Sequence, residues 1–343
     1  MPRLPPDLCG HTARERGTTL NVHVNESCIG CGLCANMCPT VFTMLEEGVA
    51  AARDEIGPEV EAYVQQDPLP TVTTTQTTEA TIPTEPSKTS SSPYRLRASD
   101  ATLVQLNYAA NRKPDLEALL TQPLSWDLTA DEPSVLILHS HGTEAFVPGD
   151  GYTYEEEGGE YRTTDERCNM LSLGAELARL LNAAGIPTLQ DRNYYDYPDY
   201  PASYDNARTG VKKILEQYPG IKLVIDLHRD SAAREDGSQW ATEAVINGER
   251  SAQVMLVIGT DSHYSHPNWE QNLSLALKLH AIMEKTHPGS TRPLDLRKQR
   301  FNQDLSTGAI IAEIGAAGNT HREAMNAVSV LAEAIILLSQ GSN

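Results

Sequence analysis

The chain is short of positive charge. Its 343 residues hold 27 Lys and Arg against 46 Asp and Glu, which gives a formal net charge of −19. Nucleic acids are polyanions and would be repelled by such a surface, so the charge balance argues against a nucleic-acid partner. It is compatible with a small-molecule, peptide or glycan substrate.

Long apolar runs are also missing. No run reaches the length required to span a bilayer, and the first residues, MPRLPPDLCGHTARERG, lack the apolar centre of a secretory signal. Arg14 and Arg16 do not form a twin-arginine pair. We therefore see no export route in the sequence.

The segment from Pro68 to Pro93, PLPTVTTTQTTEATIPTEPSKTSSSP, has no aromatic residue and few apolar ones. Such a composition buries too little surface to offset its ordering entropy, so we predict an extended linker. It divides the chain into three parts: residues 1–66, the linker at 67–93, and a large globular domain at 94–343.

Cysteines are few, and four of the six lie within the stretch CIGCGLCANMCP. Clustering of this kind indicates a metal or cluster site, because a disulfide scaffold spreads its cysteines across the fold. The spacing C-x2-C-x2-C-x3-C-P resembles the cluster loop of bacterial ferredoxins. The resemblance covers residues 21–65 and implies a [4Fe–4S] cluster on Cys28, Cys31, Cys34 and Cys38, with a chance cluster or a zinc site as the alternative.

This ferredoxin resemblance is incomplete. In two-cluster ferredoxins the fourth cysteine of the run serves the other cluster, and a distal Cys-Pro closes the first one. Here the linker begins where that distal cysteine would follow, so Cys38 or Cys9 would have to substitute. We predict that the segment does not perform the main reaction of the protein and that any cluster is labile or structural.

After residue 93, short apolar runs alternate with helical patterns. The runs are Val135–Leu138, Leu223–Leu227, Val254–Ile258 and Ala309–Ile314. The segment MLSLGAELARLLNAAG has leucines at helical spacing and Gly185 at its end. This alternation predicts an α/β fold with a mostly parallel twisted sheet and helices on both faces.

Three of these runs carry side chains suited to metal chemistry. HSHGTE follows the first run, DLHRD closes the second, and Glu313 lies in the last. Side chains alternate along a strand, so His139 and His141 are expected on one face, and Asp226, His228 and Asp230 on another. Ligands of α/β sheets gather beyond the carboxyl ends of the strands. Two imidazoles and a carboxylate there would suit zinc, whereas the alternative is a set of ordinary strand-end residues.

A longer series of motifs carries a specific resemblance. The motifs are HSHGTEAF, TTDERCNMLSLGAELARLLNAAGI, YPASYDNARTG, VIDLHRDS, IGTDSHYSHPNWEQNLSLA and HPGSTRPLDLRKQRFNQDLSTGAIIAEIGAAGNTHREA. Together they resemble the sporulation stage II protein P family, and the similarity covers roughly Pro133 to Gln340. The resemblance implies a zinc-dependent N-acetylmuramoyl-L-alanine amidase, with endopeptidase activity as well, that cuts peptidoglycan during engulfment of the forespore.

Position by position, the resemblance implies zinc ligands at His141 and His228 and a catalytic glutamate at Glu313. For the third ligand we expect Glu144, with Asp165 or Glu166 as alternatives. Arg229 would orient substrate or a metal ligand, or form a structural ion pair. The residues expected in a substrate groove are His139, Asn268, Trp269 and Asn302.

The resemblance also implies an envelope location and wall-remodelling protein partners, although the usual membrane anchor of the family is replaced here by the ferredoxin-like segment. Two other classes of function compete with a peptidoglycan hydrolase. One is an iron–sulfur electron-transfer or redox-regulated protein, and the other is a non-catalytic wall-binding domain. The set of His141, His228 and Glu313 favours the hydrolase.

Overall fold

The computed structural model describes residues 95–341, with gaps at 109–111, 127, 129–131, 150, 158–160 and 232–238, and the backbone of four short strands nearer the N-terminus. The chain divides into two compact units, Met1–Ser87 and Lys88–Asn343. The four clustered cysteines and the expected linker at 67–93 lie outside the described residues.

In the first unit the described strands form two antiparallel pairs. One pair is β1 (Arg14–Arg16) with β2 (Thr19–Asn21), and the other is β3 (Phe42–Met44) with β4 (Ala50–Ala52).

The second unit is built on a seven-stranded sheet, as expected. In spatial order its strands are β5 (Leu106–Tyr108), β12 (Leu294–Arg297), β11 (Val254–Gly259), β13 (Gly308–Ala316), β8 (Leu223–Asp230), β6 (Val135–Leu138) and β7 (Thr188–Gln190). Every neighbouring pair is parallel except β11 with β13, which is antiparallel. A separate hairpin joins β9 (Ala244–Ile246) to β10 (Glu249–Ser251).

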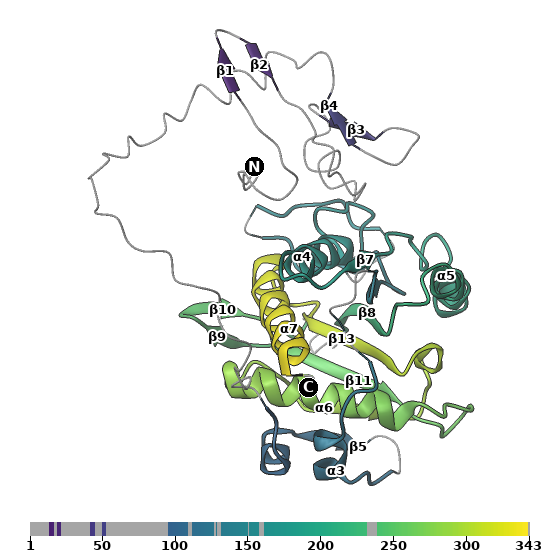
Figure 1. Ribbon diagram of the computed structural model, residues 1–343. Coiled ribbons are helices and arrows are strands. Elements are labelled where there is room, and N and C mark those ends of the chain that lie inside the picture. The colour runs from purple at the N-terminus through teal and green to yellow at the C-terminus, as the bar shows by residue number, and fades with distance from the viewer. Residues whose placement is uncertain are drawn as a thin grey trace, which may run out of the picture. The chain divides into compact units, whose positions relative to one another are not determined.

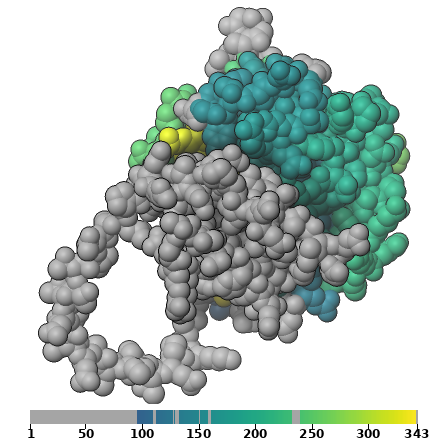
Figure 2. Space-filling model, turned by 90° about the horizontal axis from the view of Figure 1, so that it is seen from above, coloured from purple at the N-terminus to yellow at the C-terminus, as the bar shows by residue number. Residues whose placement is uncertain are grey.

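Helices cover the two faces of this sheet unequally. One face carries α4 (Met170–Ala183), α6 (Trp269–Thr286) and α7 (His321–Gly341), while the other carries α5 (Ser203–Gln217). In Figure 1, β8, β13 and β11 follow one another through the middle of the unit, with α7 in front of them. Figure 2, seen from above, shows the adjoining teal and green surfaces of the segments that contain α4 and α5.

Shorter elements complete the unit. The helix α3 (Leu116–Thr121) packs against α6, and 3-10 turns lie at η1 (Ala98–Leu103), η2 (Tyr200–Ala202) and η3 (Gln303–Leu305).

The bounds of α4 follow from its sequence. The side chain of Asn169 accepts a hydrogen bond from the backbone N–H of Leu171, which caps the start of the helix. Leu173, Leu177 and other apolar residues at helical spacing are buried against the sheet. Gly185 takes a φ of 79° directly after the helix, a conformation that glycine adopts without strain.

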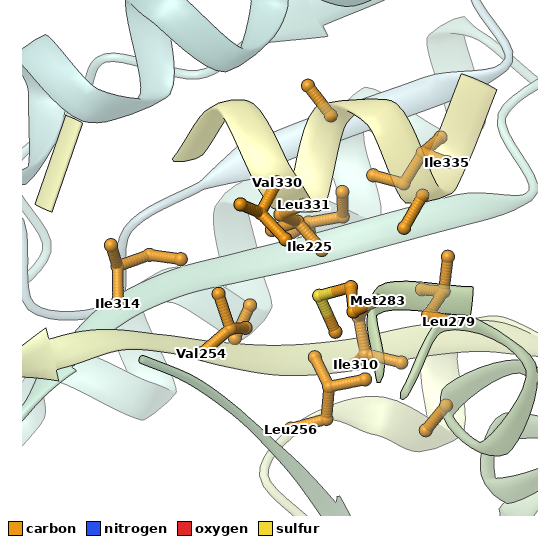
Figure 3. Packing of buried hydrophobic residues seen from close by; sticks show 14 of the residues in the cluster. Ile225, Val254, Leu256, Leu279, Met283, Ile310, Ile314, Val330, Leu331 and Ile335 are labelled. Carbon is orange, nitrogen blue, oxygen red and sulfur yellow. The ribbon is translucent and has the colours of Figure 1, made fainter. Parts of the chain in front are cut away.

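The main core lies between the sheet and the face that carries α4, α6 and α7. Figure 3 shows Leu279 and Met283 from α6 and Val330, Leu331 and Ile335 from α7 packing against strand side chains; the labelled strand residues are Ile225, Val254, Leu256, Ile310 and Ile314. Burying one such side chain stabilises the fold by roughly 1.5–3 kcal/mol. This core fixes the strands that carry the site described below.

One described helix, α7, is long and apolar enough to cross a membrane by length and composition, which the sequence analysis did not anticipate. Half of its most apolar window is buried inside the fold. It contacts α4, α6 and β13, so its apolar side chains belong to the core.

Alternation along β8 and β13 separates core residues from polar ones. On β8, Ile225 and Leu227 point into the main core, whereas Asp226 and His228 point to the face that carries α5. On β13, Glu313 pairs in register with His228. We call this second face the site face.

Candidate metal centre

Three side chains converge on the site face. His141, Glu144 and His228 each offer one ligand atom, and these atoms all lie within 4.8 Å of one another. The Nδ1 atoms of His141 and His228 lie 3.5 and 3.4 Å from the two carboxylate oxygens of Glu144. Two imidazoles and a carboxylate are a ligand set that zinc accepts with an open position. The structure therefore brings together the ligands expected from the sequence, Glu144 included.

The remaining ring nitrogens of both histidines face polar side chains. The Nε2 atom of His141 lies 3.1 Å from the Ser203 hydroxyl at the start of α5. The Nε2 atom of His228 lies 2.9 Å from Oδ1 of Asp226. Groups that hold the far nitrogen of a metal-binding imidazole fix its orientation, so Asp226 and Ser203 are arranged as supports of the two ligands.

Contacts with Arg229 and the two imidazoles keep the carboxyl group of Glu144 ionised. Its Oε2 atom accepts the backbone N–H of Arg229 at 3.2 Å, and the Arg229 guanidinium lies 3.9 Å from Oε1. Burial alone would raise the pKa of Glu144, but Arg229 and the two imidazoles hold that pKa well below its usual range. Arg229 itself is fully buried and donates from Nε to the carbonyl of Ala145, so it positions Glu144.

The charge on His228 is governed by Asp226. Burial acts to lower the pKa of His228, yet the Asp226 carboxylate outweighs it and the pKa lies well above its usual value. Asp226 also accepts the backbone N–H of Ser140 at 2.8 Å and the Ser140 hydroxyl at 2.5 Å. This fixed carboxylate orients His228 and raises its basicity as a ligand.

Glu313 lies beside the three converging residues on the neighbouring strand. Its Oε2 atom is buried and has no hydrogen-bond partner among the described residues. Burial, together with the carboxylates of Glu144 and Asp230, raises the pKa of Glu313 to about 8. A carboxyl group with a raised pKa next to a metal centre can accept or deliver a proton near neutral pH.

Aromatic side chains surround the imidazoles. The ring of Tyr200 stacks on His141 with centroids 4.5 Å apart, and the guanidinium of Arg162 lies 3.9 Å from the centroid of the Tyr200 ring. The ring of Tyr204 is nearly parallel to that of His228, with centroids 6.4 Å apart. These rings and Ser203 come from η2 and the first turn of α5, so the segment YPASYD builds one wall of the site.

His139 lies elsewhere. β6 ends at Leu138 and a turn follows, so strand alternation does not extend to His141 and the two histidines do not share a face. His139 is fully buried, with Nδ1 3.1 Å from the Leu227 carbonyl and Nε2 3.0 Å from the Gln190 amide. Burial lowers its pKa to about 4. The structure thus does not place His139 where substrate would contact it.

The two alternative acidic ligands also lie apart from the three residues. Asp165 forms an ion pair with Arg167 at 2.5 Å, and Glu166 forms one with Arg192. Neither belongs to the group of ligand atoms around His228.

The structure places the residues expected in a substrate groove in different parts of the fold. Asn268 and Trp269 begin α6, and Trp269 packs against the main core on the opposite face of the sheet. The structure does not bring them to the metal centre. Asn302 has a left-handed φ of 61° and donates to the backbone carbonyl of Tyr204 at 2.7 Å, so it supports the aromatic wall.

The sequence analysis missed the roles of Asp226, Ser203 and the two tyrosines. Asp226 was expected on the same face as His228, and its position two residues before that histidine on a strand was the signal for its role as a support of the imidazole. Ser203 and Tyr204 carry no such signal, since only the packing of α5 against β6 and β8 brings them to His141 and His228.

Two family models match the chain. The model described as Stage II sporulation protein P (SpoIIP) matches residues 50–336, and the model described as 4Fe-4S single cluster domain of Ferredoxin I matches residues 24–67. A curated relative, the stage II sporulation protein P of Bacillus subtilis (strain 168), is 29% identical over 216 residues, which is 60% of this chain and 51% of that protein. The chain thus spans about half the length of the curated relative.

Solved structures with a distant likeness include amidases. The N-acetylmuramoyl-L-alanine amidase AmiC2 of Nostoc punctiforme has a TM-score of 0.38 at 12% identity, over 62% of this chain and 97% of that one. The CwlD amidase from Clostridioides difficile, in complex with the GerS lipoprotein, has a TM-score of 0.33 at 12% identity, over 61% and 98%. At such scores the likeness is too distant to indicate function.

Proposed function

Because the chain belongs to the stage II sporulation protein P family, whose model covers residues 50–336, we propose that it is a metal-dependent hydrolase of peptidoglycan. The bond we assign to it is the amide between the muramoyl lactyl group and L-alanine, with cross-link peptide bonds as a second target. We place this chain in the cell envelope, because its proposed substrate is peptidoglycan.

One observation carries the proposal: the His141–Glu144–His228 group, in which Glu144 and His228 are buried, lies next to a carboxyl group with a raised pKa. The donor set suits zinc in number and kind, and each donor is already oriented by Ser203, Arg229 or Asp226. Zinc held by these three residues would act as a Lewis acid and activate water for attack on an amide.

The other side chains then have defined tasks. Glu313 takes a proton from the attacking water and returns it to the leaving amine, which suits a buried carboxyl group with a pKa near neutrality. Arg229 keeps Glu144 ionised without touching substrate. The rings of Tyr200 and Tyr204 border the site and exclude water from the imidazoles.

The test uses the purified full chain and isolated sacculi. We expect release of stem peptides with a free N-terminal L-alanine, identified by mass spectrometry, and loss of this release in a zinc chelator with recovery on adding zinc. Release of disaccharide fragments alone, or of nothing from any sacculus, would show that the assignment is wrong.

A second function has its own observation, the match of residues 24–67 to a 4Fe-4S single cluster domain. We propose that Cys28, Cys31, Cys34 and Cys38 ligate one cluster, which is structural or labile and takes no part in hydrolysis. Amide hydrolysis transfers no electrons. Anaerobic reconstitution with iron and sulfide, followed by iron analysis and electron paramagnetic resonance, tests it. Less than about one cubane per two chains, with four intact thiols, would count against cluster binding.

A further inference from the structure

A second group of contacting side chains lies at the end of β8, two residues beyond His228, and it consists of Arg292, Asp230 and Trp240. The Nη2 atom of Arg292 donates to Oδ2 of Asp230 at 2.7 Å. The guanidinium carbon of Arg292 lies 4.7 Å from the centroid of the Trp240 ring. Asp230 therefore holds one edge of the guanidinium, and the ring of Trp240 packs against its plane.

The position of Arg292 follows from the sheet. Its backbone N–H donates to the carbonyl of Val254 on β11, whereas its side chain reaches Asp230 at the end of β8. Arg292 precedes β12, and both β11 and β13 lie between β12 and β8, so its side chain passes the ends of these two strands to reach Asp230. Asp230 pairs with Ala316 and lies two residues after His228, so its side chain is on the site face, beyond the register shift that follows Glu313.

One edge of this guanidinium is unused. Its Nη1 atom is buried and has no hydrogen-bond partner in the part of the chain that the structure describes. A buried donor without a partner is unfavourable, and an arginine edge matches a carboxylate, which accepts two parallel N–H bonds. The side chain as a whole is 14% exposed although Nη1 itself is covered, so a carboxylate reaches this edge once the chain around it moves aside. Asp230 and Trp240 keep the arginine in one orientation, as a receptor requires.

We propose that Arg292 is the binding site for a carboxylate of the peptide stem. This inference rests on the proposed function and names the side of the substrate that the site recognises. In a stem where D-glutamate is joined through its side chain, the α-carboxylate of the second residue stays free and lies close to the amide that is cut. The peptide also has a C-terminal carboxylate, which is the other source of the same chemistry.

Binding of product peptides separates these sources without turnover, because a peptide that lacks the muramoyl group has no scissile lactyl amide. We compare L-Ala-γ-D-Glu-L-Lys, its α-amide at D-Glu and its C-terminal amide by calorimetry with the full chain. Wild type should bind the α-amide about ten- to hundred-fold more weakly than the free acid, as expected for a charge-assisted bond. It should bind the C-terminal amide unchanged.

Arg292→Gln should lose the same ten- to hundred-fold for the free acid and should no longer distinguish it from the α-amide. Arg179→Gln is the matched control and should bind as wild type, because Arg179 pairs with Glu176 within α4, on the opposite face of the sheet. Equal loss by Arg292→Gln for all three peptides, or no loss, overturns the proposal. If wild type binds the C-terminal amide more weakly than the free acid but binds the α-amide unchanged, the carboxylate bound is the C-terminal one and the assignment to D-Glu is wrong.

Arg292→Gln also leaves Asp230 without its partner, so Arg292→Lys serves as the second variant. It keeps the charge and the ion pair but offers no arginine edge, and its preference for the free acid should fall about tenfold at an unchanged melting temperature. An undiminished preference in Arg292→Lys overturns the proposal. A chain that binds the free acid through Arg292 yet releases nothing from sacculi would retain this site and lose the hydrolase assignment.

Discussion

Replacing Asp226 by asparagine tests whether the metal centre depends on the support of His228. The substitution keeps the size of the side chain and removes its charge. In the structure the carboxylate lies 2.9 Å from Nε2 of His228 and accepts both the N–H and the hydroxyl of Ser140. An amide can accept only part of this set, and its NH₂ group must face either the imidazole or the serine.

The expected effect is a loss of zinc affinity of about 10–100-fold, the usual result of removing such a support. At about 1.4 kcal/mol per tenfold, this equals roughly 1.4–2.8 kcal/mol of binding free energy. Hydrogen bonds to a charged group are about twice as strong as neutral ones, which is why the charge and not the shape decides the result.

The assay is a competition titration of zinc against a chromophoric chelator, made on the full chain and on Asp226→Asn. Both chains keep all their cysteines, so any zinc bound by thiolates cancels in the difference. Asp100→Asn, which breaks an ion pair with Lys285 on the far side of α6, is the control and should bind zinc as wild type. Equal affinity in wild type and a folded Asp226→Asn would refute the reasoning.

Three further outcomes are expected. Glu313→Gln should bind zinc as wild type but hydrolyse peptidoglycan about 10²–10⁴-fold more slowly, measured as peptide release, and an active variant would move the proton transfer to another residue. Deleting residues 1–93 should leave the hydrolysis rate nearly unchanged, and a several-fold change would give the N-terminal segment a part in catalysis. Lys278 donates to the Leu119 and Leu120 carbonyls at the end of α3, and burial lowers its pKa to about 8. The unfolded chain therefore binds more protons between pH 8 and 10, so the free energy of unfolding should rise with pH more steeply in wild type than in Lys278→Met. Parallel curves from urea titrations would contradict this.

Much of the second unit was predictable because its signals are local. The run Val135–Leu138 is apolar throughout and forms β6 as expected. The spacing of leucines and the final glycine predicted α4. The strand β8 runs three residues beyond its apolar run, since His228 and Asp230 point to the site face and need no apolar neighbours. The strands β5, β7 and β12 were missed because they have only three or four residues, too few for a periodic pattern to stand out.

The site was predictable in part for the same reason. His141, Glu144, His228 and Glu313 lie in motifs that point to metal chemistry, and the structure groups them. The face of His139 was not predictable, because the turn after Leu138 interrupts the alternation from which it was inferred. The wall formed by η2 and α5 depends on contacts between segments some sixty residues apart, such as that of His141 with Ser203.

The unequal covering of the sheet has a consequence for how the preference for a substrate can change. On the site face, α5 packs over β6 and β8, and no described α-helix packs over β11 and β13. Near Glu313 that face is lined by Met255, Val257 and Ile311, with Phe301 beside them. The side chains of Met255, Val257 and Ile311 are at most 7% exposed, so this half of the face is covered although no described α-helix lies on it. Phe301 comes from the loop before η3, so the choice of what reaches Glu313 from this side falls to loop side chains, which can change in sequence without disturbing the sheet.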